Sequence, residues 1–412
     1  MKKFLVLFLS LCVMLAGQPV LAESQTARSG KTEPAINAEA AMLMDAASGQ
    51  ILYQRNPDER LPIASITKMM TAIVALEKGN LEAKVTIGPD VMDRNKVYGT
   101  LVYLEPGEQF TLHDLLYAML LNSANDAAVA VADYIGGSVD GFVQLMNQEA
   151  QKLGAYDTHF VNPDGLTEPG HYSSARDMAL IARCGLENPV FSQIVGTKAK
   201  DFPRAKAGLP NKLDNINRML WLYDGADGVK TGYTEAAEHT FVISATRDGR
   251  RLIAVGLKDP FPRTADKDAA ALLDYGFSQY HDVLLAAKGQ ALNSVQLSAG
   301  QVLKLVPDTD VYGTLANGAQ DSFQLKPKPG NLSLPIKAGE ARGQLEIYLQ
   351  GKLVQTVPLV AEESVGVPEP VPLSPKSGLI WYLLTTVALV TLVMVQRRLA
   401  RRSRRVVYRS GN

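Results

Sequence analysis

Cysteine is nearly absent from this sequence, and neither sign of charge is in excess. The 412 residues include two cysteines, 42 basic residues and 42 acidic residues, so the formal net charge is zero. A neutral chain has no overall positive field to attract nucleic acid, and we expect no nucleic-acid partner. Cys12 lies in an apolar run near the N-terminus, which leaves Cys184 alone in the remaining chain and excludes an intramolecular disulfide there. No internal repeat is found.

The N-terminal segment has the pattern of a signal peptide. Two lysines precede an apolar run over residues 4–17, and Val20-Leu21-Ala22 supplies a small-residue cleavage site. We therefore expect residues 1–22 to be removed. The polar, patternless residues 23–36 are typical of a flexible leader.

A second apolar run lies near the C-terminus. Residues 378–396 carry no charge, and a helix of this length can span a bilayer. Seven arginines follow in the 397–412 tail, so the positive-inside rule predicts a cytoplasmic tail and an extracytoplasmic position for everything before Gly378. Residues 362–377 contain four prolines, which is typical of an extended stalk. The sequence thus predicts a protein held in the cell membrane by one C-terminal pass, with its catalytic domain on the extracytoplasmic side.

The pattern between these ends predicts two domains. In residues 37–283, short predicted strands at both ends enclose a helical middle, which predicts an α+β fold with helices packed on an antiparallel sheet. The predicted strands are 41–45, 51–53, 229–232, 239–245 and 251–257, and the predicted helices are 66–76, 111–121, 126–134, 140–153, 175–185 and 265–280. Residues 284–361 show short strands only and predict a small all-β domain.

Residues 62–72 combine a buried helix with two polar groups. Apolar residues surround this predicted helix instead of forming a stripe, and Ser65 and Lys68, three residues apart, face the same way. A lysine whose pKa is lowered by burial can take the proton of a serine hydroxyl and make it a nucleophile. An isolated Ser-x-x-Lys pair is, however, more often a helix cap followed by a lysine that reaches solvent.

Two further elements follow in the chain. Ser123-x-Asn125 lies at the predicted corner between two helices, and Lys230-Thr231-Gly232 lies on a predicted strand. Each alone also fits an ordinary structural role: a helix cap for Ser123 and Asn125, and an exposed strand residue for Lys230. We expect His171, His239 and Asp177 to be structural. Together and in this order, the three elements match the serine–lysine signature of penicillin-binding proteins and class A β-lactamases.

At these residues the sequence resembles the D-alanyl-D-alanine carboxypeptidases, low-molecular-weight penicillin-binding proteins and serine peptidases of the SxxK class. The likeness extends over residues 36–280 and includes several further segments. These are Leu104-Glu105-Pro106-Gly107-Glu108, Asn125-Asp126-Ala127-Ala128, Asn162-Pro163-Asp164-Gly165-Leu166, the segment from His171 to Asp177, and the segment from Leu272 to Phe277.

The resemblance implies a β-lactamase/penicillin-binding-protein-like domain over residues 37–283. It also implies removal of the terminal D-alanine from peptidoglycan stem peptides ending in D-Ala-D-Ala, through an acyl-enzyme and without metal or cofactor. β-Lactam antibiotics would be covalent inhibitors. Ser65 would be the nucleophile, Lys68 its proton acceptor, and Ser123 a relay of the proton toward the leaving D-alanine.

The resemblance assigns the remaining residues to substrate binding. Asn125 would hold the substrate amide, and Lys230 and Thr231 would hold the terminal carboxylate. Lys230 would also lower the pKa of Lys68 by like charge. Gly232 would let the substrate lie against the strand edge, and the backbone N–H groups of Ser65 and Tyr233 would form the oxyanion hole.

Three departures from related sequences accompany this likeness. Tyr233 stands where some relatives have histidine, and Glu238 stands where relatives often have glycine. No Glu-x-x-Leu-Asn segment lies between Asn125 and Lys230, where a class A β-lactamase keeps its deacylating base, so long-lived acylation by penicillins is expected. Two alternatives stay open: an endopeptidase or transpeptidase with the same site, and a non-catalytic ectodomain that binds cell wall or senses β-lactams.

Overall fold

The computed structural model describes residues 33–202, 204, 206, 208–297, 300–367 and 375–407, the last range with residues 375–377 and 400–407 as backbone only. The predicted signal peptide, most of the predicted leader, residues 368–374 of the predicted stalk and the last five residues lie outside these ranges. The chain divides into two compact units, one comprising residues up to Leu284 together with Tyr312–Asp321, the other Leu285–Val311 and the chain from Ser322 on.

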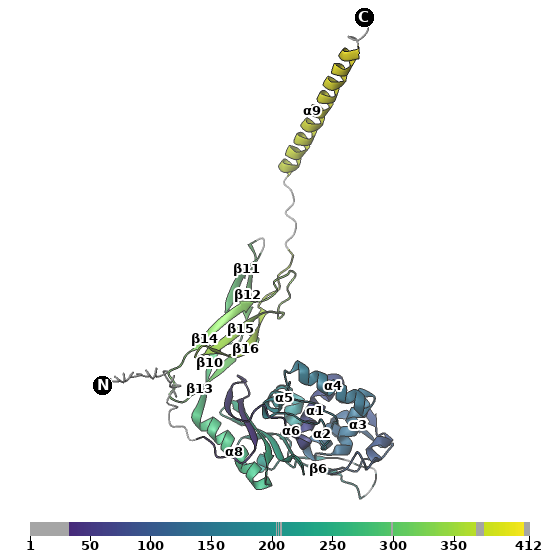
Figure 1. The fold of residues 1–412 in the computed structure, drawn as a ribbon, viewed down its shortest axis with the longest axis vertical. Helices are drawn as coiled ribbons and strands as arrows, with labels where there is room; N and C mark the ends of the chain where they lie inside the picture. Colours follow the sequence, from purple (N-terminus) through teal and green to yellow (C-terminus); the bar gives the residue numbers. More distant parts are fainter. Residues whose placement is uncertain are drawn as a thin grey trace, which may run out of the picture. The chain divides into compact units, whose positions relative to one another are not determined.

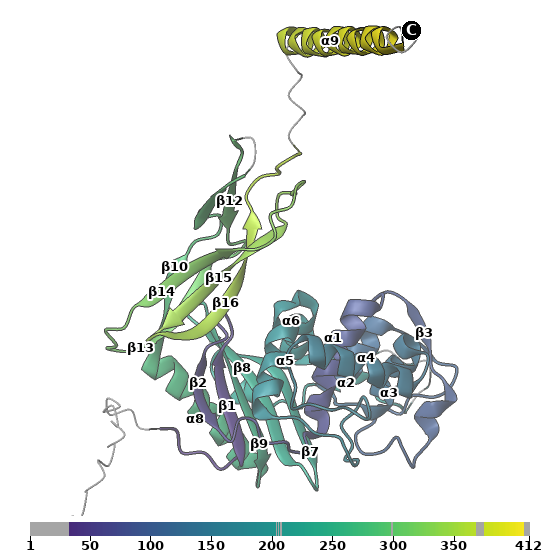
Figure 2. The ribbon, with the colours of Figure 1, turned by 45° about the horizontal axis from the view of Figure 1, so that its top comes forward.

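The first unit, which includes helices α1–α6 and α8 of Figure 1, is built on a five-stranded antiparallel sheet with strand order β2-β1-β9-β8-β7, whose strands are labelled in Figure 2. Its strands are β1 (Ala40–Asp45), β2 (Ile51–Arg55), β7 (Ala226–Thr234), β8 (Glu238–Arg247) and β9 (Arg250–Asp259). Strand β1 is apolar and buried along almost its whole length because both faces of the sheet are covered. Met42 and Met44 point into one core, and the alternate residues Ala41 and Leu43 point into the other.

Helices cover both faces of this sheet (Figure 2). The core on one face is formed with the long helix α8 (Pro262–Gln279), and the core on the other face contains the remaining long helices of the unit. Those helices are α1 (Lys68–Lys78), α2 (Leu112–Leu121), α3 (Asn125–Gly136), α4 (Val139–Lys152), α5 (Ala175–Glu187) and α6 (Pro189–Gly196). The predicted α+β fold is confirmed.

Shorter elements complete the unit. They are the 3-10 turns η1 (Ala64–Thr67) and η2 (Pro89–Met92), helix α7 (Met219–Leu222), and the strand pairs β3 (Lys84–Thr86) with β4 (Gln109–Thr111) and β5 (Ala199–Asp201) with β6 (Lys212–Asp214).

The observed helices differ from the prediction at two places. The helix predicted from residue 66 begins at Lys68, because residues 64–67 form the tighter turn η1. Helix α6 was not predicted, although Asn188 and Pro189 are a helix-start signal: the Asn188 side chain accepts hydrogen bonds from the N–H groups of Val190 and Phe191. The predicted caps Thr111 and Ser174 each accept a hydrogen bond from the residue three positions on.

The second unit contains a five-stranded antiparallel sheet with strand order β11-β12-β16-β15-β14. The strands are β11 (Asn293–Gln296), β12 (Val302–Val306), β14 (Phe323–Pro329), β15 (Ala341–Leu349) and β16 (Lys352–Ala361). The predicted all-β domain is thus confirmed. Val365 lies beyond β16, is buried and pairs with Ile336, so the ordered chain continues into the segment predicted to be stalk.

Strand β10 (Tyr280–Ala286) pairs with β13 (Val311–Ala316) in a two-stranded sheet. The compact first unit therefore includes Tyr312–Asp321, which a simple division between residues 283 and 284 does not anticipate.

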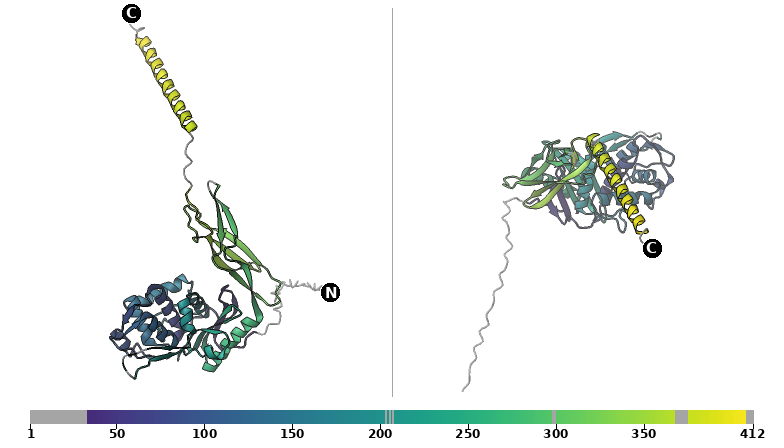
Figure 3. Two further views of the ribbon diagram at one scale, coloured as in Figure 1. Left: turned by 180° about the vertical axis from the view of Figure 1, so that it is seen from behind. Right: turned by 90° about the horizontal axis from the view of Figure 1, so that it is seen from above.

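The described chain ends in a single long helix, α9 (Pro375–Val407), which is uninterrupted in both views of Figure 3. Its segment Gly378–Leu399 has 22 residues with a mean hydropathy of 2.2, and none of its apolar window is buried. Among the described residues, this is the one helix long and apolar enough to cross a membrane. Its length and composition fit a membrane anchor.

Candidate active site

The Ser65 hydroxyl and the Lys68 amine lie next to each other at the start of α1. Ser65 belongs to η1 and Lys68 is the first residue of α1, and their side chains approach to 3.0 Å between Oγ and Nζ. The Lys68 amine also donates to the side-chain oxygen of Asn125 and to the backbone carbonyl of Asp164, each at 2.6 Å. Three chain segments therefore converge on one buried amine.

The environment of Lys68 disfavours its charged form. The side chain is fully buried, and this desolvation lowers the pKa of Lys68 from its usual 10.5 to about 8. The negative charges of Asp164 and Asp126 act in the opposite direction and limit the decrease in the pKa of Lys68. An amine with this pKa is substantially neutral near pH 8 and can accept a proton.

The partners of Lys68 also determine where its lone pair points. A neutral amine has two hydrogens, and two carbonyl oxygens, of Asn125 and Asp164, are placed to accept them. The remaining lone pair then faces Ser65 Oγ. This arrangement is the one that a general base for the serine hydroxyl requires.

Ser123 and Asn125 lie at the corner between α2 and α3, as predicted. Ser123 is buried and has a φ of +63°, a left-handed conformation that is unusual for serine and often marks a functional constraint. Asn125 begins α3, and its side-chain nitrogen donates to the backbone carbonyl of Tyr98 at 2.5 Å. The Asn125 amide is therefore held at both ends, by Lys68 and by Tyr98.

Lys230 lies on β7, the outermost strand of the sheet, and is as deeply buried as Lys68. Its amine donates to the carbonyl of Thr231 at 2.8 Å. Burial, and second the charge of Lys68, lower the pKa of Lys230 well below its usual value.

The two buried amines are also coupled electrostatically. Burial is the main cause of the lowered pKa of Lys68, and the like charge of Lys68 adds to the lowering of the pKa of Lys230. The expected effect of Lys230 on the pKa of Lys68 stays a prediction, because two interacting groups titrate as a pair.

Gly232 is required where β7 packs against η1. A Cβ atom at this position would lie 2.7 Å from the backbone nitrogen of Ser65 and 2.7 Å from Oγ1 of Thr240. The absent side chain thus makes room for the serine-bearing turn. The expected role of Gly232, space for substrate along the strand edge, is not tested by this contact and stays a prediction.

A pocket of about 280 Å³ connects these elements. Ser65, Ser123, Thr231, Gly232 and Tyr233 all line it. Of the eight residues predicted to form the site, these five line the pocket, and Lys68, Asn125 and Lys230 are buried next to them through the contacts described above. The structure therefore brings the residues of all three predicted elements together.

Sequence reasoning missed part of the pocket wall. Arg218 and Asp266 form an ion pair at 3.1 Å and line the same pocket. His239, expected to be structural, also lines it and packs against the ring of Tyr233 at 4.7 Å between ring centroids. Arg218 and Asp266 lie outside any motif, so only the fold could reveal them. Glu238 has a φ of +50°, which gives a physical reason why glycine would be favoured there.

The loop 162–166 packs against η1 and forms hydrogen bonds with side chains of α1. Besides the Asp164 carbonyl on Lys68, the carbonyl of Pro163 accepts a hydrogen bond from Thr71 at 2.6 Å. A Cβ atom on Gly165 would lie 1.9 Å from the carbonyl oxygen of Ala64, so the loop packs directly against η1. The Asn-Pro-Asp-Gly sequence indicated a turn, but not its backbone contact with the lysine.

Asp177 is structural, as expected. Its carboxylate accepts hydrogen bonds from the N–H of Asp157 and from the hydroxyl of Thr158, both at 2.7 Å. It therefore ties α5 to the preceding loop.

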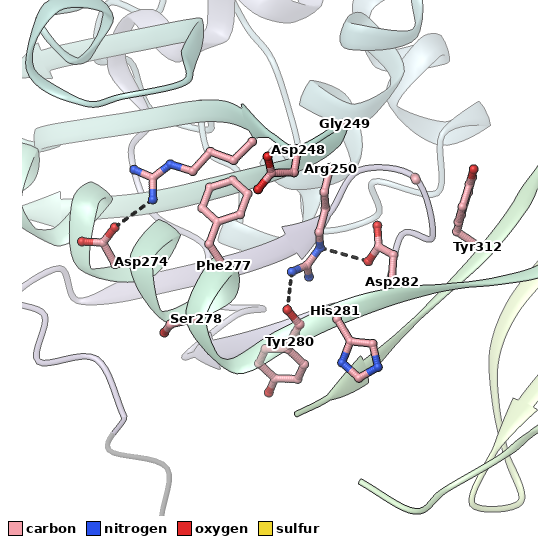
Figure 4. A pocket seen from close by; sticks show the side chains of 12 residues that line it. Asp248, Gly249, Arg250, Asp274, Phe277, Ser278, Tyr280, His281, Asp282 and Tyr312 are labelled. Carbon is pink, nitrogen blue, oxygen red and sulfur yellow. Dashed lines mark hydrogen bonds and ion pairs between the residues drawn. The ribbon is translucent and has the colours of Figure 1, made fainter. Parts of the chain in front are cut away.

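A larger cavity of about 890 Å³ lies near the β8–β9 turn and the end of α8 (Figure 4). Its wall carries the ion pairs Arg247–Asp274 and Arg250–Asp282. Its serine, Ser278, donates its hydroxyl to the carbonyl of Tyr275 and not to a base. Size alone therefore does not identify the active site. Among the described residues, no three His, Cys, Asp or Glu side chains are grouped to hold a metal ion.

A serine and a buried lysine three residues apart, on helices packed against an antiparallel sheet, place this protein in the serine–lysine class of penicillin-binding proteins and class A β-lactamases. A family model described as D-alanyl-D-alanine carboxypeptidase matches residues 27–260, and one described as the C-terminal domain of penicillin-binding protein 5 matches residues 280–367. The chain belongs to the D-alanyl-D-alanine carboxypeptidase family.

Individual relatives agree with this assignment. D-alanyl-D-alanine carboxypeptidase DacF of Bacillus subtilis (strain 168) is 35% identical over 343 residues, covering 81% of this chain and 87% of that protein. D-alanyl-D-alanine carboxypeptidase DacC of Escherichia coli (strain K12) is 34% identical over 352 residues, covering 81% of this chain and 85% of that protein.

Solved structures share the fold. Crystal structures of penicillin-binding protein 5 from Haemophilus influenzae match 82% of this chain and 100% of that chain, with a TM-score of 0.67 and 32% identity. The Streptomyces K15 DD-transpeptidase matches 60% of this chain and 99% of that chain, with a TM-score of 0.56 and 34% identity.

Proposed function

We propose that this protein is a serine carboxypeptidase that removes the terminal D-alanine from peptidoglycan stem peptides ending in D-Ala-D-Ala. One observation carries the proposal: the buried amine of Lys68 lies 3.0 Å from the hydroxyl of Ser65 and has two carbonyl oxygens placed to accept the hydrogens of its neutral form. Membership of the D-alanyl-D-alanine carboxypeptidase family and the names of the relatives support it.

In the first step, Ser65 Oγ attacks the carbonyl carbon of the penultimate D-alanine while its proton moves to Lys68 Nζ. The backbone N–H groups of Ser65 and Tyr233 stabilise the negative oxygen of the tetrahedral intermediate. The C–N bond then breaks, and the leaving D-alanine nitrogen receives a proton through the hydroxyl of Ser123. The product is an ester of Ser65.

Substrate binding uses the second buried lysine, Lys230, and the residue that follows it. Lys230 and the hydroxyl of Thr231 bind the terminal carboxylate, and this anion raises the pKa of Lys230 so that it binds as an ammonium. Asn125 donates the second hydrogen of its side-chain amide to the substrate backbone.

In the second step, water attacks the ester carbonyl and its proton passes to Lys68. The bond between the carbonyl carbon and Ser65 Oγ then breaks, Lys68 returns the proton to Oγ, and the shortened peptide leaves as a carboxylate. Penicillins acylate the same serine. Because no Glu-x-x-Leu-Asn segment lies between Asn125 and Lys230, where a class A β-lactamase keeps its deacylating base, we expect this ester to be hydrolysed slowly.

We further propose that the enzyme is held in the cell membrane by α9, with its catalytic unit on the extracytoplasmic side. The apolar segment Gly378–Leu399 and the arginines that follow it in the sequence support this orientation. A protease added to intact cells should digest the catalytic unit, and protection from the protease would contradict the orientation.

Release of free D-alanine tests the activity. The full-length protein in detergent is incubated with a synthetic peptide ending in D-Ala-D-Ala. We expect release by the natural protein and by Ser294→Ala, an exposed serine of β11, and none by Ser65→Ala. Acylation by labelled penicillin without any D-alanine release would instead support a β-lactam-sensing ectodomain.

Transpeptidation is a second candidate, because the Streptomyces K15 DD-transpeptidase shares the fold of the catalytic unit. Adding a D-amino acid as an amine acceptor to the same assay distinguishes the two activities. A carboxypeptidase yields mainly the shortened peptide, whereas a transpeptidase yields the exchanged peptide.

A further inference from the structure

A strained residue immediately precedes the proposed nucleophile. Ala64 has a φ of +50°, in the left-handed region that costs a non-glycine residue about 1 kcal/mol or more. Such a conformation persists only where its surroundings hold it. Because Ala64 and Ser65 share a peptide bond, this conformation determines where the Ser65 backbone N–H points.

The carbonyl oxygen of Ala64 is fixed from two sides. The hydroxyl of Thr67 donates to it at 2.8 Å. Gly165 packs so closely that a Cβ atom there would lie 1.9 Å from the same oxygen. The carbonyl therefore has little freedom to rotate back to an ordinary conformation.

The Thr67 hydroxyl is in turn oriented by His171. The distance between Thr67 Oγ1 and His171 Nε2 is 2.8 Å, and the backbone N–H of Val161 donates to Nδ1 of the same ring at 3.2 Å. Thr67 uses its single hydrogen on Ala64, so it can only accept from His171. The ring is therefore neutral, with its proton on Nε2.

This chain of hydrogen bonds is enclosed. His171 and Thr67 are buried, and burial lowers the pKa of His171 to about 4. The histidine thus keeps one tautomer over the range in which the enzyme would work, and its position does not vary with pH there.

We infer that His171 is a positioning residue for the reaction: acting through Thr67, it holds Ala64 in the left-handed conformation that aims the backbone N–H and hydroxyl of Ser65. The inference rests on the proposed role of Ser65 as the nucleophile. It assigns a task to a histidine that has no part in a lysine-based proton transfer.

The rate of acylation by a fluorescent penicillin tests this inference, because it reports the reactivity of Ser65 whether or not D-alanine is released. Thr67→Val removes only the hydroxyl, and His171→Leu removes the donor. We expect each to slow acylation by about 10- to 100-fold, since small displacements of a reacting group and lost oxyanion stabilisation cost rates of this order.

Conservative variants separate positioning from a general packing role. Thr67→Ser keeps the hydroxyl and His171→Gln keeps an N–H donor, so both should recover acylation to within about threefold of the natural rate. The double variant Thr67→Val/His171→Leu should be no slower than the slower single variant, because both act through one chain of bonds. Thr197→Val removes a hydroxyl that also donates to a backbone carbonyl, outside the site, and is the matched control.

The outcomes distinguish the two proposals. Normal acylation by Thr67→Val would overturn the positioning role and leave the proposed function intact. Penicillin acylation of the natural protein without D-alanine release would contradict the carboxypeptidase, yet the same variants would still decide the positioning role. If His171→Leu does not fold, as judged by circular dichroism, Thr67→Val decides alone.

Discussion

Two buried lysines lie in this site, and they differ in the number of hydrogen-bond partners around their amines. The amine of Lys68 has three hydrogen-bond partners, whereas the amine of Lys230 is bonded to the carbonyl of Thr231. A buried ammonium with few partners is costly, and a second ammonium nearby adds to that cost. We therefore expect Lys230 to lower the stability of the fold, and a bound carboxylate to offset that cost.

Replacing Lys230 by methionine should separate stability from binding. Lys230→Met removes the buried charge at similar volume, so we expect the free energy of unfolding at pH 7 to rise by about 1–2 kcal/mol. Without its cation for the carboxylate, the variant should lose about 10- to 100-fold in kcat/KM. Chemical denaturation and steady-state kinetics measure the two effects.

The lowered pKa of Lys230 determines how the stability gained by Lys230→Met should vary with pH. The folded pKa of Lys230 is lowered, so the unfolded chain binds more protons between that pKa and 10.5, and the stability of the natural protein rises with pH in this window. The advantage of Lys230→Met should therefore be largest at neutral pH and disappear toward pH 10.5. Lys84→Met, at an exposed strand lysine, is the control. A less stable Lys230→Met at pH 7 would contradict the account.

Lys68 should set the acid limb of the rate profile. As a general base it must be neutral, and its pKa is about 8, so kcat/KM should fall about tenfold for each pH unit well below 8 and level off above it. Penicillin acylation should show the same limb, because it uses the same base. A limb near pH 10, or a flat profile between pH 6 and 9, would exclude this role for Lys68.

At the scale of elements, activity depends on the contact between β7 and η1. Gly232→Ala would place a methyl group 2.7 Å from the Ser65 backbone nitrogen, and backbone atoms must then move. We expect acylation to slow by about 100-fold or more, because displacing β7 disturbs the serine and the oxyanion hole together. Stopped-flow acylation by a fluorescent penicillin measures it.

Gly88→Ala is the matched control, since Gly88 has a φ of −80° and no atom lies within 4 Å of its added Cβ. It should acylate at the natural rate. If Gly232→Ala is acylated as fast as Gly88→Ala, β7 can move away from η1 without slowing acylation, and the prediction is wrong.

The sequence predicts elements better than it predicts their contacts. Apolar periodicity and caps were enough for α2 and α5, and motif order was enough to bring Ser65, Ser123 and Lys230 together. The carbonyl of Asp164 on Lys68 could not be predicted, because every residue has a backbone carbonyl and only the fold decides which one is near. The burial of the two lysines, which lowers both of their pKa values, also follows only from the fold.

At the scale of the whole molecule, the first unit includes Tyr312–Asp321, a segment that follows part of the second unit in the sequence. Thr314 is buried and lies 3.0 Å from the hydroxyl of Ser48, and it donates to the carboxylate of Asp282 at 3.2 Å. The backbone N–H of Thr314 also donates to the side chain of Gln50. A domain boundary placed at residue 283 would separate Thr314 from the residues that it contacts in the first unit.

A protein ending at residue 283 should therefore be less stable than one ending at residue 367, although both keep every proposed site residue. Losing Thr314 removes its hydrogen bonds to the buried Ser48 and to Asp282, at about 0.5–1.5 kcal/mol for each bond, although Ser48 keeps its bond to Asp45 and Asp282 keeps its ion pair with Arg250. This predicts a melting temperature lower by roughly 2–10 °C, measured by scanning calorimetry. Thr314→Val in the longer protein removes only the hydroxyl and should reproduce part of the decrease. Equal melting temperatures for all three proteins would show that residues 37–283 fold as a self-sufficient domain and that the returning segment contributes nothing to it.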